Sequence, residues 1–486
     1  MRKALITTVS AAAALAMAAA ALTAATNGDE LLKDERHFLE QSQKTFTGGS
    51  KTGSARNMAV VGTNDLGGRG FNADVWAHEG YAYVGQWGFS DWTNGSKARF
   101  CPSGDKAGVA VLDARDPASP RVVSRLLNPA GTSAEDVVVF TALFGPMAGR
   151  DIAAVGIQVC GGSRYDESFK RGIQLFDVTN PAAPAEVGFL SSGCCTRGVH
   201  ELEFAHRTDL GKTFVYASVP TSEYDDSASP SGRRDQQGRG DFRLVDITNP
   251  AAPVETSNWG VLRNLGAAPT PGQGCDADGV YGHSAMPSHD GKIAFLSYWD
   301  SGFIALNVTN PANPVFKGRT VYEPDEDGDA HSSMYDMERK LLFTADEDFC
   351  KTSGPGIETG YGYLRIYDYS NLKAPHQIGE FRTQNSLGLG AQGSGDYTIH
   401  NAFVVGTDVY ISWYSDGIRV VDASNPRAPR EVAHFVPPAG QNTVKPSQRG
   451  TLSNTTQVWG VYVDEVTGLV YASDMNTGLW ILRRTD

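Results

Sequence analysis

The chain has 486 residues and is acidic, with 55 Asp and Glu against 42 Lys and Arg, which gives a formal net charge of −13. This balance argues against nucleic acid and anionic membranes as partners and is compatible with binding cations. After residue 25 no apolar stretch is long enough to span a bilayer, so we expect no membrane span.

Residues 1–25 have the form of a secretory signal peptide, with Arg2 and Lys3, an apolar stretch rich in Ala and Leu, and small residues at 23–25. We expect cleavage near Ala25 and export to the extracellular space or a periplasm. Residues 26–56 hold a mixed-charge stretch compatible with a short surface helix, followed by a Gly/Ser/Lys linker. We expect residues 57–486 to form the folded part, as a monomer.

A proline-containing motif recurs along the chain, and each copy follows a short apolar run. The Asp or Asn at its head can bond its own backbone two residues further on, and the Asn-Pro step favours a turn. A second Pro suits the start of an edge strand. The copies are DARDPASP (113–120), DVTNPAAP (177–184), DITNPAAP (246–253), NVTNPANP (307–314), DYSNLKAP (368–375) and DASNPRAP (422–429), and a seventh breaks off as RRTD (483–486).

The apolar runs predict buried strands, because they lack the alternation of a sheet with one solvated face. Two further strands precede each run and one follows the proline turn, so each unit reads as a four-stranded antiparallel meander. Similar units at this spacing predict an all-β, seven-bladed β-propeller. The runs are VAVLD (109–113), IQLFD (173–177), FRLVD (242–246), FIALN (303–307), LRIYD (364–368), IRVVD (418–422) and LWILR (479–483).

The last unit lacks an outer strand, and a candidate lies near the other end of the chain. NMAVVGTND (57–65) resembles the outer strand AEVGFL (185–190) around its Val-Gly step. We predict that this N-terminal strand completes the last blade and closes the ring, which removes two exposed sheet edges.

The repeated run and turn resemble the LVIVD-repeat family over roughly residues 57–486, although Asn307, Leu372 and Arg483 depart from the pattern. The resemblance implies a secreted or surface β-propeller. It brings no catalytic signature, so it implies no catalytic residues for this chain.

Six cysteines fall in loops that open on one face of the expected ring, which we call the top face. An even number in an exported chain favours disulfides, although six cysteines allow 15 pairings. The adjacent pair Cys194 and Cys195 leaves redox or metal chemistry open as the alternative. The disulfide candidates are Cys101, Cys160, Cys194, Cys195, Cys275 and Cys350.

Four of the ten histidines open the inner strands of blades 3 to 6: His200, His283, His331 and His400. Inner strands line the channel of a propeller, so we expect these imidazoles to converge at its top mouth and to suit zinc, copper or iron. Glu135 and Trp459 occupy the corresponding places in blades 2 and 7. Alternatively, each histidine satisfies backbone groups at the mouth of a duplicated repeat.

A second candidate site is acidic and lies in two top loops of blade 5. One loop carries Asp325, Asp327 and Asp329, and the other begins with Asp346, Glu347 and Asp348. Alternating carboxylates on adjacent loops suit calcium, but the spacing matches an EF-hand loop only in part. The alternative is a solvated acidic loop.

These observations lead to two functional hypotheses. The first is an extracellular binding module that recognises an unidentified ligand or protein through its loop-rich top face. The second is a metal-dependent enzyme, an oxidoreductase or hydrolase, in which the four histidines hold the ion and Glu135 or Asp346 assists proton transfer. Metal content is the first property that separates them.

Overall fold

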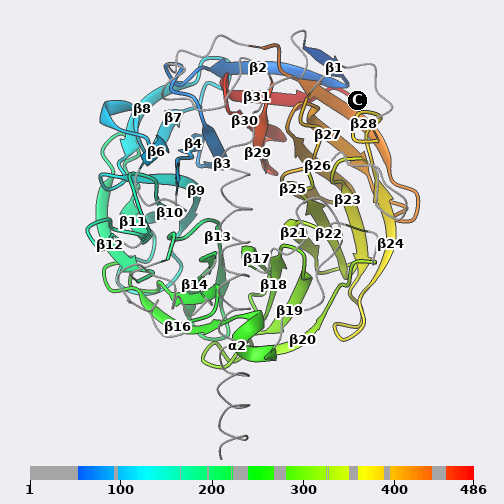
Figure 1. Cartoon of the computed structure of the whole chain (residues 1–486). Helices are drawn as coiled ribbons and strands as arrows, with labels where there is room; N and C mark the ends of the chain where they lie inside the picture. Colours follow the sequence, from blue (N-terminus) through cyan, green and yellow to red (C-terminus); the bar gives the residue numbers. More distant parts are fainter. Residues whose placement is uncertain are drawn as a thin grey trace, which may run out of the picture.

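The computed structural model describes residues 53–486 apart from 92–96, 165, 194–195, 221, 223–238, 267–280, 324–325, 327, 350–359, 388–394 and 440–455. The described strands form a ring of sheets around a central channel (Figure 1). Pairing groups them into seven four-stranded antiparallel blades, with a single bridge from Gln86 to Ala134 joining the first two blades. The predicted all-β propeller is therefore confirmed.

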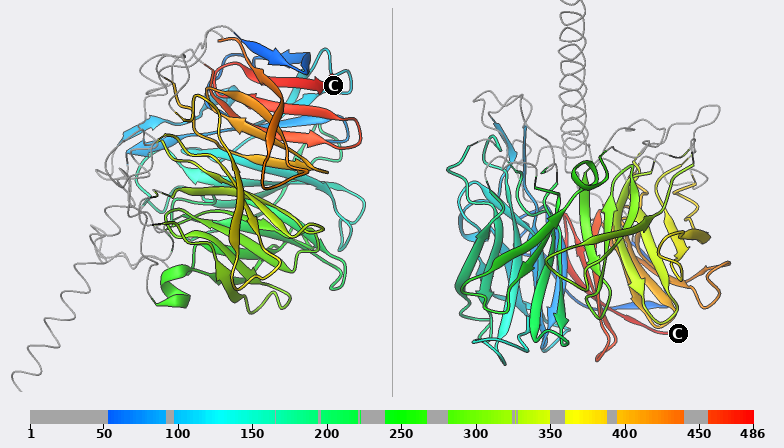
Figure 2. Two further views of the ribbon diagram at one scale, coloured as in Figure 1. Left: turned by 90° about the vertical axis from the view of Figure 1, so that its right-hand side faces the viewer. Right: turned by 90° about the horizontal axis from the view of Figure 1, so that it is seen from below.

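In blades 1 to 6 the chain runs from the channel outward, and Figure 2 shows the ring from two sides. Blade 1 consists of β3 (Asn72–His78), β4 (Tyr81–Gln86), β7 (Val109–Asp113) and β8 (Arg121–Leu126). Blade 2 consists of β9 (Thr132–Thr141), β10 (Asp151–Val159), β11 (Gly172–Asp177) and β12 (Ala185–Ser191). Blade 3 consists of β13 (Leu202–Arg207), β14 (Lys212–Ser218), β15 (Phe242–Asp246) and β16 (Val254–Trp259).

The next three blades repeat this order. Blade 4 consists of β17 (Gly282–Pro287), β18 (Ile293–Tyr298), β19 (Gly302–Asn307) and β20 (Val315–Arg319). Blade 5 consists of β21 (Ala330–Asp336), β22 (Leu341–Asp346), β23 (Leu364–Asp368) and β24 (His376–Phe381). Blade 6 consists of β25 (Ala402–Val405), β26 (Asp408–Trp413), β27 (Gly417–Asp422) and β28 (Arg430–Val436).

Blade 7 is built from both ends of the described chain. Its strands are β29 (Val458–Asp464), β30 (Leu469–Asp474), β31 (Gly478–Arg484) and the N-terminal β2 (Met58–Asn64), which pairs antiparallel with β31. The predicted closure is confirmed, and the Val-Gly step has a physical reason. A Cβ on Gly62 would lie 2.1 Å from the carbonyl oxygen of Pro117, and one on Gly188 would lie 2.0 Å from that of Pro250. Both glycines let an outer strand approach the proline turn of the next blade.

A few short elements lie outside this scheme. β1 (Ser54–Arg56) adds a fifth strand to blade 6 by pairing with β28, in a segment that the sequence analysis assigned to a linker. The insertion in blade 1 carries the hairpin β5 (Phe89–Asp91) and β6 (Lys97–Phe100) and the 3-10 turn η1 (Gly104–Lys106), and α2 (Val261–Leu265) follows blade 3. None of the described helices has the length and hydropathy needed to cross a membrane.

The proline turns take the predicted form. Oδ1 of Asp422 accepts a hydrogen bond from the backbone N–H of Ser424 at 2.9 Å, and Asn307 accepts one from Thr309 at 2.9 Å. The head residues of the other copies accept the same bond, at 2.8–3.2 Å. Each of these apolar runs therefore ends in a turn that is stabilised by the side chain of the last residue of the run.

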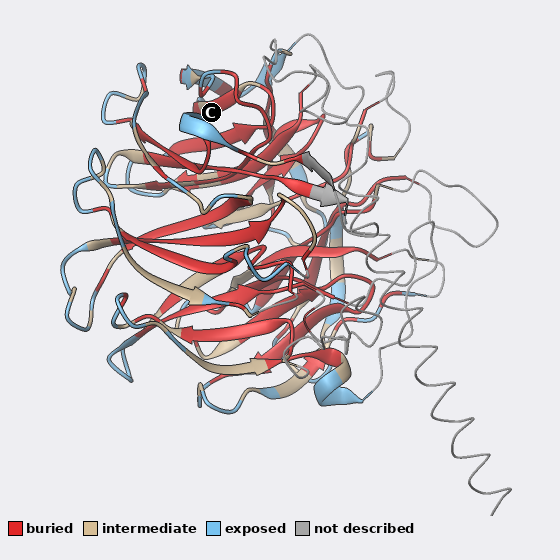
Figure 3. Ribbon diagram, turned by 60° about the vertical axis from the view of Figure 1, so that its left-hand side comes forward, coloured by how far each residue is buried: buried red, intermediate tan, exposed pale blue. Residues whose placement is uncertain are grey.

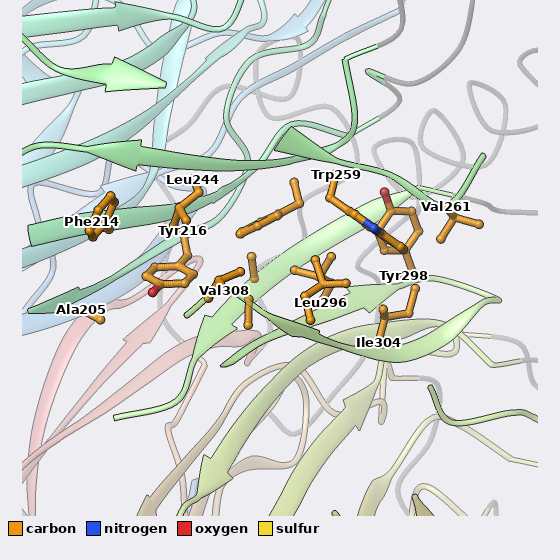
Figure 4. Packing of buried hydrophobic residues seen from close by; sticks show 14 residues of the cluster. Ala205, Phe214, Tyr216, Leu244, Trp259, Val261, Leu296, Tyr298, Ile304 and Val308 are labelled. Carbon is orange, nitrogen blue, oxygen red and sulfur yellow. The ribbon is translucent and has the colours of Figure 1, made fainter. Parts of the chain in front are cut away.

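The hydrophobic core lies between neighbouring blades. Between blades 3 and 4, Tyr216 and Trp259 pack with Leu296, Tyr298 and Ile304 (Figure 4). Because each sheet is covered on both faces, its middle strands are buried along nearly their whole length, while the turns are exposed (Figure 3). This explains why the apolar runs do not alternate.

Candidate metal centre

A β-bulge interrupts the inner strand near its top end in blades 1, 2, 4, 5 and 7. The pairing of β17 with β18 skips His283, and that of β21 with β22 skips His331. Such a bulge places two residues opposite one and turns the side chain of the extra residue. In blades 3 and 6 the two residues at the same place lie directly before the inner strand. In blade order the residue pairs at these positions, which we call the bulge ring, are Ala73–Asp74, Glu135–Asp136, His200–Glu201, His283–Ser284, His331–Ser332, His400–Asn401 and Trp459–Gly460.

The first members of these pairs bring the four imidazoles together in one row. Nε2 of His200 lies 2.8 Å from Nε2 of His283. The ring centroid of His331 is 4.0 Å from that of His283 and 4.1 Å from that of His400. All four side chains are buried, with at most 4% of the residue exposed.

Three glutamates meet this row. Oε2 of Glu135 is 2.6 Å from Nδ1 of His200, and Oε1 of Glu201 is 3.6 Å from Nδ1 of His283. Oε2 of Glu347 is 3.8 Å from Nε2 of His331. The repeat pattern pointed to Glu135 but not to Glu201, and Glu347 was expected in the acidic loop. Glu201 directly follows His200 and Glu347 directly follows Asp346, and these positions were the available signal in the sequence.

The structure divides the candidate ligands differently from the predicted set of four histidines. Two groups of described side chains bring ligand atoms within 4.8 Å of one another: His200, Glu201 and His283, and His283, His331 and Glu347. We call these five residues the channel cluster. His400 belongs to neither group, and its ring lies 4.5 Å from that of Trp459. The four-histidine ligand set stays a prediction, and the structure brings carboxylates beside three of its histidines.

The second members of the bulge pairs connect the blades around the cluster. Oγ of Ser284 donates to the carbonyl of His331, and Oγ of Ser332 donates to the carbonyl of His400, both at 2.7 Å. Across blade 7, Nδ2 of Asn401 donates to Oδ1 of Asp74 at 2.7 Å. These hydrogen bonds hold the backbone that carries the imidazoles.

Burial controls the charge of this site. It lowers the pKa of His200 to about 3, and together with neighbouring imidazoles it lowers the pKa values of His331 and His400 well below their usual range. These three imidazoles are thus neutral near pH 7 and have lone pairs for a metal ion.

The carboxyl groups respond to burial in the opposite direction. Burial raises the pKa of Glu135 well above its usual range, and burial with repulsion from Asp74 and other carboxylates does so for Glu201. Burial also raises the pKa of Asp136 to about 7. A cation bound here would favour the ionised form of these carboxyl groups and lower their pKa values again.

Aromatic rings occupy the inner strands beyond the bulges. The ring of Trp76 lies 4.7 Å from Tyr462 and 6.0 Å from Phe204, and Phe204 stacks on Phe140 at 4.4 Å. Because these residues come from blades 1, 2, 3 and 7, they fill the channel on the side away from the top face.

The acidic loops of blade 5 do not form a described calcium site. Asp325 and Asp327 lie outside the described residues. Asp346 forms an ion pair with Arg365 and accepts a hydrogen bond from Tyr322 at 2.9 Å. Its role in proton transfer stays a prediction. Asp329 and Asp348 are buried and belong to neither ligand group. Calcium binding stays a prediction.

One predicted disulfide is present, between Cys101 and Cys160. It joins the top loops of blades 1 and 2, as expected of cysteines that brace this face. Cys194, Cys195, Cys275 and Cys350 lie outside the described residues.

The comparisons with known proteins agree with the repeat pattern. The model of the LVIVD repeat matches residues 69–89, which cover β3 and β4, and residues 237–260, which cover β15 and β16. The chain therefore carries LVIVD repeats. The resemblance inferred from the runs and turns is confirmed. No curated protein matches the sequence of this LVIVD-repeat protein.

Several solved structures resemble the LVIVD-repeat protein at low identity. A putative 6-phosphogluconolactonase from Bacteroides uniformis shares 10% identity with a TM-score of 0.46, over 79% of this chain and 88% of that one. A chain of the mitotic checkpoint complex shares 10% identity with a TM-score of 0.48, over 89% and 95%. The β-propeller domain of Cps50 (Swd1) from Myceliophteria thermophila shares 11% identity with a TM-score of 0.45, over 86% and 98%.

Proposed function

We propose that this LVIVD-repeat propeller is an exported binding module whose channel holds a transition-metal ion. One observation carries the proposal: His200, His283 and His331, from three consecutive blades, meet Glu201 and Glu347 within coordinating reach in a buried channel. The signal-like N-terminus supports export, and the long loops of the top face support recognition of a ligand there.

The donor set selects the class of metal. Imidazole nitrogens with carboxylate oxygens suit zinc, iron or copper better than calcium or magnesium, which prefer oxygen alone. Oε1 of Glu135 and Oε1 of Glu201 are buried and have no hydrogen-bond partner. A bound cation would give both oxygens the partner that a buried carboxylate needs.

The position of the ion indicates a structural role. Its ligands come from blades 3, 4 and 5, so an ion would cross-link their inner strands below the top face. The burial of all these ligands agrees with such a role. The ion would thus hold the loops of these blades in a fixed arrangement for ligand binding.

A metal-dependent enzyme is the second candidate, and the composition of the ligand groups favours it. Each group contains two histidines and one carboxylate, a set that leaves coordination positions open for a substrate or oxygen. Glu135 beside His200 would then be the proton-transfer group. Burial of every member of the channel cluster argues for the structural role.

Metal analysis tests the proposal. The mature protein, purified without a histidine tag, should contain stoichiometric zinc, iron or copper, and the double variant His283→Ala/His331→Ala should contain none. His206→Ala is the matched control, because His206 lies on β13 outside the channel cluster and bonds Thr213. Circular dichroism should first show that the parent protein is folded. If the folded protein then contains no stoichiometric metal, this result would falsify the proposal.

A further inference from the structure

The channel cluster contains two ligand groups that overlap at one residue. Ligands of one transition-metal ion lie about 2.0–2.2 Å from it, so any two of them are separated by at most about 4.4 Å. The five side chains do not form one group within a 4.8 Å limit; they form the pair of triads that share His283. The cluster therefore offers two candidate positions for an ion, which overlap at His283.

Glu201 lies between these positions. Its Oε1 is 3.6 Å from Nδ1 of His283 and 3.7 Å from Nε2 of His331, so it faces imidazoles of both triads. Oε1 has no hydrogen-bond partner, and the residue is only 8% exposed. A carboxylate has two oxygens and can place one on each of two ions, which leaves His283 free to serve a single ion.

The channel also contains more carboxyl groups than one ion takes as ligands. Five buried carboxyl groups lie near the imidazoles: Asp74, Glu135, Asp136, Glu201 and Glu347. A buried carboxylate is stable only beside a compensating cation, so two divalent ions could hold more of these groups in the ionised form than one ion could.

We propose that the channel holds two divalent transition-metal ions, one between His200 and His283 and the other between His331 and Glu347, with Glu201 as the bridging carboxylate. This inference rests on the proposed metal-binding function. It adds a second ion and makes Glu201 the bridge between the two ions. Neither His283 nor His331 can be this bridge, because a neutral imidazole has a single nitrogen lone pair and so binds one ion.

The number of ions and their coupling test the inference. The mature full chain is stripped with a chelator and reloaded with Zn²⁺ for native mass spectrometry, or with Cu²⁺ for electron paramagnetic resonance. We expect two Zn²⁺ per chain and a spin-coupled Cu²⁺ pair. Glu201→Gln should lower the zinc count from two to one or abolish the coupling, whereas Glu347→Gln should leave one ion at His200 and His283.

Glu203→Gln is the matched control, because Glu203 lies two residues further along the inner strand and accepts a hydrogen bond from the N–H of Phe204 at 2.8 Å. This variant should keep two coupled ions. One ion in the parent protein would overturn the inference and leave the proposed function standing, whereas no ion would overturn both. Two coupled ions that persist in Glu201→Gln would also overturn the bridging role.

Discussion

The hydroxyl of Tyr414 donates a hydrogen bond to Oε1 of Glu347, the carboxylate that faces His331. Tyr414 has a φ of 31°, in the region where a bulky residue is rare. Such backbone strain of about 1–3 kcal/mol persists where the surroundings demand it. Here the ring is buried against His400 and Trp459, so the strained backbone delivers the phenol to a candidate metal ligand.

Removing this hydroxyl should weaken metal binding. Groups that orient a metal ligand contribute about 10–100-fold to affinity, so we expect Tyr414→Phe to lower Zn²⁺ affinity by about 10-fold or more in a chelator competition. Tyr369→Phe is the control, because Tyr369 donates an equally buried hydrogen bond to Phe303 away from the channel. Equal affinities for the two variants would show that Tyr414 does not position Glu347.

Closure of the ring by β2 should dominate thermal stability. Deletion of residues 57–65 exposes the edge of β31 and removes the buried Met58, so we expect a sharp fall in Tm measured by circular dichroism. Deletion of residues 54–56 is the control, because β1 is exposed and only extends the outer edge of blade 6. A Tm unchanged by the longer deletion would contradict closure.

The turn aspartates should make the propeller sensitive to acid. Hydrogen bonds from Ser424 and the nearby Arg430 lower the pKa of Asp422 to about 2, and Arg115 lowers that of Asp113 to about 2. Because the folded pKa lies below the unfolded value of about 3.9, this stabilisation is present above pH 4 and is lost as the pH falls towards 2.

The double variant Asp113→Asn/Asp422→Asn should therefore lose less Tm between pH 4 and pH 2 than the parent protein. Asn307 shows that an amide can accept the same turn hydrogen bond without titrating. Identical pH profiles for parent and variant would show that these turns do not contribute to acid unfolding.

Gly460 should be required for the packing of blade 7 against blade 1. A Cβ at this bulge position would lie 2.9 Å from the backbone nitrogen of Val75 and 3.0 Å from Oδ1 of Asp74, which Asn401 holds. We expect Gly460→Ala to lower the free energy of unfolding by about 1–3 kcal/mol, measured by chemical denaturation. Gly162→Ala, whose nearest atoms belong to the side chain of Phe169, should change it much less.

Much of the architecture follows from local sequence. The run VAVLD coincides with β7, and FRLVD and LRIYD coincide with β15 and β23. Aliphatic runs that end in Asp and an Asn-Pro step determine strands and turns through interactions a few residues apart, so repetition alone predicted the propeller. The position of His283 at the start of an inner strand also followed from this register.

The composition of the candidate site depended on tertiary structure. Glu201 lies directly before β13 and Glu347 directly after β22, and both face His331. Asp346, one residue before Glu347, pairs instead with Arg365. Two adjacent carboxylates can thus point to different places, one into the channel and the other toward an arginine. The repeat pattern does not predict which of the two reaches the channel. The sequence by itself determined the ring and its row of histidines. Only packing between blades decided which carboxylates join that row, because those contacts link residues far apart in the chain.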